Sequence, residues 1–96
     1  MEVKYPNTYL EFNTWFLIES PYGELAELDI TTELWNFLFK SFLRERGVEV
    51  LSDIVSSGWS TCVFIDRVPR FAAHAFNSTF EAESIGIQQA FEILEG

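Results

Sequence analysis

Cysteine and histidine are nearly absent from this sequence, which has only Cys62 and His74. A lone cysteine cannot form an intramolecular disulfide, so the sequence fits a reducing compartment. One cysteine and one histidine also fall short of the three or four ligands of a zinc site. A Cys–His nucleophile would need both side chains within hydrogen-bonding distance. Because His74 stands between alanines and Cys62 among apolar residues, we expect structural roles for both, and no catalytic residue, metal or cofactor.

Long apolar runs are also missing. No segment approaches the roughly 20 apolar residues that a membrane-spanning helix needs. The amino terminus, Met1–Pro6, lacks the charged start and the apolar run of a signal peptide. We therefore expect a cytoplasmic protein that has no membrane partner.

Basic residues are scarce: six Lys and Arg stand against fifteen Asp and Glu, which gives a formal net charge of −9. Such a charge repels nucleic acid and anionic membranes and favours cationic partners. The composition therefore argues against direct nucleic-acid binding. It leaves open a protein that competes with nucleic acid for a basic surface.

Aromatic and apolar residues are abundant by contrast. The chain includes ten Phe, three Trp and three Tyr, and 48% of its 96 residues are apolar. A chain of this length forms one domain, and a small domain needs a rich core because it buries a smaller share of its surface. We expect a single domain over residues 1–96.

The first third of the chain predicts a β-hairpin. Residues 9–18 are rich in aromatic and apolar side chains that alternate in parity, as in a strand with one inner face. Residues 20–23 contain Pro and Gly, which is typical of a turn. Residues 24–30 alternate acidic with apolar side chains, which predicts a short returning strand. In the first strand, the apolar residues of the inner parity are Leu10, Phe12, Phe16 and Ile18.

A helix is predicted over residues 33–46, where a wide apolar stripe recurs at helical spacing. Thr31 or Thr32 can cap its start, and Gly47 is the expected terminator. Strands are predicted at residues 48–54 and 59–66.

After Pro69, which breaks the sheet or marks its edge, a last short strand is predicted over residues 71–76. Ser78 and Glu81 form a capping box that begins a helix over residues 79–94. Gly86 in this helix is compatible with close packing against the sheet. The fold class is therefore α+β, an antiparallel sheet of four or five strands with two helices, in the order β-β-α-β-β-(β)-α.

Three features stand together in residues 34–96. A helix with Trp near its start ends in Arg-Glu-Arg-Gly-Val, a Gly58-Trp59 strand follows a polar turn, and Ala72-Ala73-His74-Ala75 precedes the closing helix. In these features the chain resembles the phage ABA sandwich domain, a small phage-encoded family. The closing helix has Gly86 and Gln88-Gln89 where family members tend to run to alanine and cysteine. The resemblance implies a phage or prophage origin and an α/β sandwich, and it carries over no functional residue.

Acidic residues concentrate in the predicted hairpin. Alternate residues of a strand lie about 6.6–6.8 Å apart on one face, which would give Glu27 and Asp29 that spacing. Because phosphates advance about 3.4 Å per nucleotide, such a row can imitate part of a phosphate track. The alternative is a solvated outer face that only confers solubility. The candidate partner-binding acids are Glu19, Glu24, Glu27 and Asp29.

Aromatic side chains form the second candidate surface. Trp15 and Leu17 have the parity opposite the inner face of their predicted strand, and Tyr22 and Trp59 join them. Trp and Tyr are favoured anchors of binding surfaces. If one side of the sheet is open, Trp15 and Tyr22 are exposed anchors; if helices flank both sides, they belong to the core.

These observations predict a small acidic phage-type protein that binds and inhibits a host nucleic-acid-handling complex, of the anti-CRISPR or anti-restriction kind. Its partner would be a basic host protein or complex whose cationic groove accepts the carboxylates. The alternative is a structural or assembly accessory protein that forms a homodimer through a sheet edge or an aromatic patch.

Overall fold

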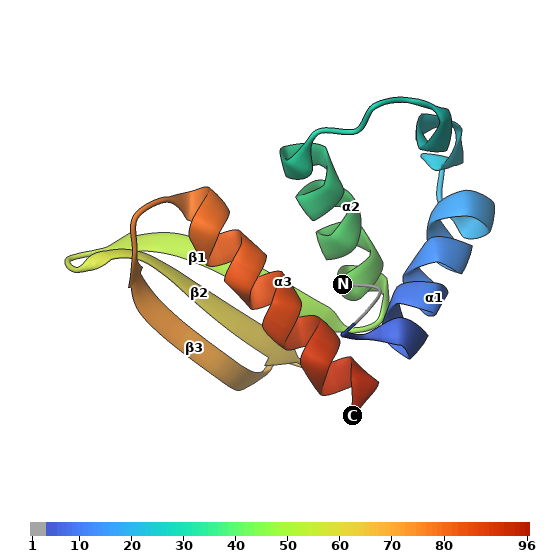
Figure 1. Ribbon diagram of the computed structural model, residues 1–96. Coiled ribbons are helices and arrows are strands. Elements are labelled where there is room, and N and C mark those ends of the chain that lie inside the picture. The colour runs from blue at the N-terminus through green and yellow to red at the C-terminus, as the bar shows by residue number, and fades with distance from the viewer. Residues whose placement is uncertain (1–3) are drawn as a thin grey trace.

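The computed structural model describes residues 4–96, and its first third is helical (Figure 1). Helix α1 (Pro6–Thr14) continues directly into a π-helix, η1 (Trp15–Glu19), and a 3₁₀-helix, η2 (Gly23–Glu27), follows. The predicted hairpin of residues 9–30 is therefore wrong. Residues 1–3 lie outside the described residues. They include Glu2 and the first half of the segment Met1–Pro6, in which no signal peptide is expected.

The helix replaces the strand because the same apolar residues satisfy two periods. Phe12 and Phe16 share a parity, but they are also four residues apart, and with Thr8 and Trp15 they form one buried helical face. Leu10 and Ile18, which a strand would bury with them, are 65% and 78% exposed. Burial in the tertiary structure therefore selects the helical period.

The first turn of α1 is completed by the other end of the chain. Pro6 occupies the start of the helix, where its missing N–H is not needed. Glu95 Oε1 accepts a hydrogen bond from Thr8 N (2.8 Å), and Oε2 accepts from Asn7 N (3.2 Å) and Asn7 Nδ2 (2.8 Å). A carboxylate at a helix amino terminus satisfies free backbone donors and the helix dipole.

The rest of the chain follows the predicted order. Helix α2 spans Thr32–Glu45, strands β1, β2 and β3 span Val48–Val55, Gly58–Ile65 and Val68–Phe76, and helix α3 spans Thr79–Glu95. The strands form one antiparallel sheet in the order β1-β2-β3. The α+β class is thus correct, but within residues 4–96 the sheet has three strands instead of four or five, and there are three α-helices instead of two.

The local signals at the helix ends act as their residue types suggest. Thr31 accepts a hydrogen bond from Leu34 N (3.2 Å), and Ser78 accepts one from Glu81 N (3.1 Å). Gly47 closes α2 with a φ of +79°, a conformation that glycine adopts without strain. Pro69 lies in β3, an edge strand, where a missing backbone donor is tolerated.

The core lies where α3, the sheet and the two other helices meet. Helix α3 crosses one face of the sheet (Figure 1). Phe12 occupies the centre of an aromatic cluster, and its ring centroid lies 4.6 Å from that of Phe39 on α2. Aromatic rings in tilted or edge contact add to the hydrophobic stabilisation. The largest fully buried side chains are Phe12, Phe16, Phe42, Phe91, Leu38, Leu43, Ile87, Val48, Val63 and Thr61.

Gly86 allows α3 to approach the sheet closely. A Cβ atom at this position would lie 2.6 Å from Val50 Cγ1, and it would overlap Thr61 Oγ1. The absence of a side chain is therefore what permits the helix to lie at this height over β1 and β2.

Candidate partner-binding surface

Residues 17–30 form a turn and a 3₁₀-helix that fold back over the end of the π-helix. Ser20 ends the π-helix: its N–H donates to Trp15 O (2.7 Å) and its hydroxyl donates to Phe16 O (2.7 Å). The same hydroxyl accepts a hydrogen bond from Tyr22 N (3.1 Å). Helix end and turn are thus joined through one side chain, and π-helical turns are frequent at functional sites.

The inner side of this segment is fixed to the core. A Cβ atom on Gly23 would lie 3.0 Å from Leu17 O. Because glycine has no Cβ, η2 can pack tightly on the end of the π-helix. The Tyr22 ring makes an edge contact with Phe37 on α2, with a centroid separation of 5.5 Å. Leu25 and Ile30 are partly buried against the core. The segment therefore has a defined position and is not a free loop.

The outer side of the segment is acidic, and we call it the acidic end. It comprises the exposed residues Glu19, Glu24, Glu27, Asp29 and Glu33. Within the described residues, none of the five takes part in an ion pair; the three ion pairs are Lys40–Glu83, Arg44–Glu49 and Arg46–Glu11.

The cations nearest in sequence to the acidic end are not paired with it. The sequence contains no Lys or Arg between Lys4 and Lys40, and Lys40 Nζ is held 3.0 Å from Glu83. At about 1.5 Å per residue, Arg44 lies roughly 16 Å farther along α2 than Glu33. Charges are screened over about 8 Å at physiological ionic strength. The five carboxylates of the acidic end therefore have no ion-pair partner in the part of the chain that the structure describes.

The arrangement of the carboxylates differs from the predicted one. Glu24 and Glu27 lie in the 3₁₀-helix η2, and Asp29 follows it in extended backbone. Because a 3₁₀-helix has three residues per turn and rises about 2 Å per residue, Glu24 and Glu27 share one side about 6 Å apart. The prediction that Glu27 and Asp29 share one face of a strand is therefore wrong. The two carboxylates that share a side are those of Glu24 and Glu27.

Exposed apolar side chains accompany these acids. Leu17, Ile18 and Leu28 are exposed. A shallow cavity of about 680 Å³ lies between the π-helix and η2. It is lined by Leu17, Gly23, Glu24, Leu25, Ala26, Glu27 and Leu28. The surface therefore offers carboxylates next to apolar contact area.

Of the two predicted aromatic anchors, Trp15 is buried in the core and Tyr22 is half-buried at the surface. Trp15 is only 2% exposed and packs between Phe12 and Phe42, so it is a core residue and not a binding anchor. Its indole N–H donates to the Glu45 carboxylate at the end of α2. Tyr22 is half-buried beside the acidic end. The role of Glu45 could not be predicted, because no local sequence pattern pairs two residues that are 30 positions apart.

Cys62 and His74 lie on neighbouring strands and line one shallow depression of about 340 Å³. His74 Nδ1 is hydrogen-bonded to Ser57 Oγ (3.1 Å). Among residues 4–96, no group of three or more His, Cys, Asp or Glu side chains could hold a metal ion. The same residues include no helix that is both long and apolar enough to cross a membrane.

Comparison of the chain with protein-family models, with curated proteins and with solved structures gives no match. The resemblance of residues 34–96 to the phage ABA sandwich domain therefore stays a prediction.

Proposed function

We propose that this protein is a binding inhibitor that docks its acidic end into a cationic groove of a host nucleic-acid-handling complex. The observation that carries the proposal is the group of five exposed carboxylates, from Glu19 to Glu33, which has no ion pair within the described residues. A basic groove that binds them would exclude its usual anionic ligand.

The position of the carboxylates suits this role because their backbone is held before binding. Ser20, Tyr22 and Gly23 fix the segment against the π-helix and α2. A surface that is already ordered loses less conformational entropy when it binds. Glu24 and Glu27, about 6 Å apart on one side of η2, approximate the advance of about 6.8 Å along the nucleic-acid axis between phosphates two steps apart.

The phage origin comes from the resemblance of residues 34–96. The anti-CRISPR or anti-restriction setting is a hypothesis from that origin together with the small size and the acidity of the chain, and both are part of the proposal. Both settings supply a partner of the required chemistry, a basic complex in the host cytoplasm that binds nucleic acid. The charge of −9 opposes direct contact with the nucleic acid itself.

The test is capture of a basic complex from a bacterial lysate on the immobilised protein, followed by elution with salt and with a DNA duplex. Replacing Glu24, Glu27 and Asp29 by Gln, Gln and Asn should weaken capture by about 10-fold, since each exposed charge pair contributes about 0.2–1 kcal/mol. The melting temperature at physiological salt should stay nearly unchanged, because none of the three side chains forms an ion pair in the described structure.

A matched control removes the same number and kind of charges elsewhere. Asp53, Glu81 and Glu92 are exposed residues of β1 and α3, and their change to Asn, Gln and Gln should leave capture unaffected. Equal losses in both triple variants, or capture that DNA does not displace, would contradict the proposal.

A structural or assembly accessory role is the second candidate. The uncovered face of the sheet, with Leu51 exposed on it, is the observation that favours self-association. Association through the outer edge of β3 is disfavoured, because Pro69 removes a backbone donor and the pairing with β2 is irregular.

A further inference from the structure

One face of the sheet is covered by α3, and no described element covers the other (Figure 1). Along β1 and β2, side chains of one parity, such as Val48, Val50 and Val63, are buried beneath α3. Side chains of the opposite parity form what we call the open face. Its residues are Glu49, Leu51, Asp53, Val55, Ser60, Cys62, Phe64 and Ala72.

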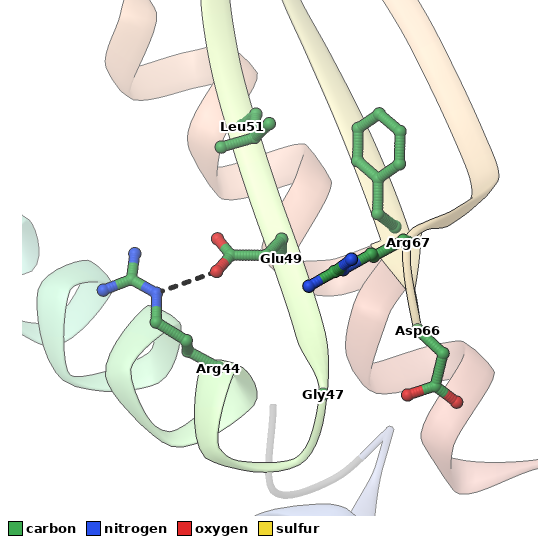
Figure 2. Close-up of a pocket in the computed structure, with 7 residues that line it drawn as sticks. Arg44, Gly47, Glu49, Leu51, Asp66 and Arg67 are labelled. Carbon is green, nitrogen blue, oxygen red and sulfur yellow. Dashed lines mark hydrogen bonds and ion pairs between the residues drawn. The ribbon is translucent and has the colours of Figure 1, made fainter.

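The open face has an apolar floor. Leu51 is 53% exposed, and Cys62 is its cross-strand neighbour on β2. Phe64 pairs with Glu49 in the same register and is half-buried. Leu51 and Phe64 line a cavity of about 480 Å³ together with Arg44, Gly47, Glu49, Asp66 and Arg67 (Figure 2).

Charged side chains border this cavity in balanced number. Arg44 Nε lies 3.0 Å from Glu49 Oε1. Figure 2 shows the Arg67 side chain extending across the sheet toward Glu49, yet no ion pair joins the two. Two cations, Arg44 and Arg67, thus stand against two anions, Glu49 and Asp66, in a chain whose net charge is −9.

The turn that presents Arg67 is conformationally unfavourable. Asp66 and Arg67 both have positive φ values, +50° and +69°. Two-residue hairpin turns of this kind favour Asn-Gly or Asp-Gly, and a bulky residue in this region is strained. This turn holds Arg67 beside the apolar floor at the cost of an unfavourable backbone conformation.

We propose that the open face binds a second copy of this chain, face to face. Two molecules that each carry a charge of −9 repel one another, unless they approach through a region where charge is balanced. Around Leu51 and Phe64 the charges balance, and the apolar floor supplies contact area. A cationic partner would be drawn instead to the acidic end, where no cation competes.

A twofold axis parallel to β2, midway between the two sheets, brings opposite charges together at one end of this face. Face-to-face sheets pack about 10 Å apart with strands nearly aligned. Glu49 lies on the β1 side and Arg67 on the side of the β2–β3 turn, at the same end of the sheet. Rotation about this axis places the β1 side of one sheet opposite the β3 side of the other, so each Arg67 faces Glu49 of the second copy. Cys62, at the middle of the central strand, lies near the axis.

The area fits a weak dimer. Three strands about 4.8 Å apart and eight residues long, at about 3.4 Å per residue, cover roughly 14 Å by 27 Å. This projected area of about 390 Å² is below the roughly 600 Å² per partner at the lower end of specific interfaces, so the expected association is weak.

Sedimentation equilibrium between about 1 µM and 1 mM tests the dimer, because weak interfaces dissociate in this range. We expect a monomer–dimer equilibrium that Leu51→Lys weakens at least about 30-fold. Ile54→Lys is the matched control: Ile54 is also on β1 and 65% exposed, but it has the opposite parity. It should dimerise like the wild type, and so should the variant neutralised at Glu24, Glu27 and Asp29.

Alkylation of Cys62 provides a second measurement. Its rate should fall as the concentration of the wild type rises through the dimer range, and it should stay constant for Leu51→Lys. A protein that is monomeric at every concentration would overturn the proposal. A dimer that Leu51→Lys leaves intact would also overturn it. So would a monomeric protein whose capture of a different partner is lost in the Leu51→Lys variant, because the open face would then bind that partner instead of a second copy.

Discussion

At the scale of single residues, Gly86 and Thr61 set the distance between α3 and the sheet. The Thr61 hydroxyl is buried and, within the described part of the chain, has no hydrogen-bond partner. It lies directly beneath Gly86, so the helix and the strand are in contact at this point with no room for another atom. Protein interiors transmit such crowding because they are close-packed.

Gly86→Ala should lower the free energy of unfolding by about 1–3 kcal/mol, because the added methyl group must displace Val50 or Thr61. In an uncrowded helix the same change would raise it by about 1 kcal/mol. Urea denaturation measures the difference. Gln88→Ala, at an exposed position of α3, is the control and should change stability by less than about 0.5 kcal/mol. Stabilisation by Gly86→Ala would contradict the close approach.

At the scale of elements, α1 depends on α3 for its beginning. Tyr5, at the N-cap position, makes no side-chain capping hydrogen bond, and Glu95 supplies the acceptors instead. The backbone N–H of Thr8, with further hydrogen bonds from Asn7, holds the pKa of Glu95 below its ordinary value. The two ends of the chain are thus joined by a charge-assisted contact.

The contact between Glu95 and α1 should make stability depend on pH in a defined direction. Because the folded pKa is lowered below 4.5, the ionised carboxylate stabilises the fold at neutral pH, and this contribution is lost as pH falls through the folded pKa. Glu95→Gln should therefore lower the melting temperature at pH 7, and the difference from wild type should shrink steadily below pH 4.5.

The control for this pH series is Glu92→Gln, an exposed position one turn earlier on α3. Its melting temperature should follow that of the wild type across the series. A Glu95→Gln variant whose deficit is constant with pH would show that the contact does not depend on charge.

At the scale of the whole molecule, negative charge is unevenly distributed along the chain. The acidic end lies at the start of α2, whereas residues 44–70 contain four Arg and four acidic residues and have no net charge. Self-repulsion among the carboxylates opposes folding and is reduced by salt. The open face lies largely in residues 44–70, where charges of both signs balance, so the two proposed surfaces are chemically distinct.

Raising NaCl from about 10 mM to 150 mM should raise the melting temperature, since the screening length falls from about 30 Å to 8 Å. The variant neutralised at Glu24, Glu27 and Asp29 should show a smaller rise than the variant neutralised at Asp53, Glu81 and Glu92. Thermal denaturation followed by circular dichroism measures both. Equal rises would indicate that the acidic end has no more self-repulsion than the rest of the surface.

The sequence by itself determined the elements whose signals are local. The stripe of α2, the caps at Thr31 and Ser78, and the glycine after α2 each act within a few residues, so they were predicted with nearly correct bounds. The concentration of acidic residues between Glu19 and Glu33 can also be seen in the sequence. Their exposure follows from charge, because an ionised carboxylate is not buried without a partner.

Only the tertiary structure decided the form of the first third of the chain and the geometry of the acidic end. Phe12 and Phe16 fit both a strand and a helix, and the choice depended on burial against α2 and on Glu95, far away in sequence. Trp15 entered the core for the same reason. Long-range contacts select between two locally compatible periods, and no local pattern contains that information.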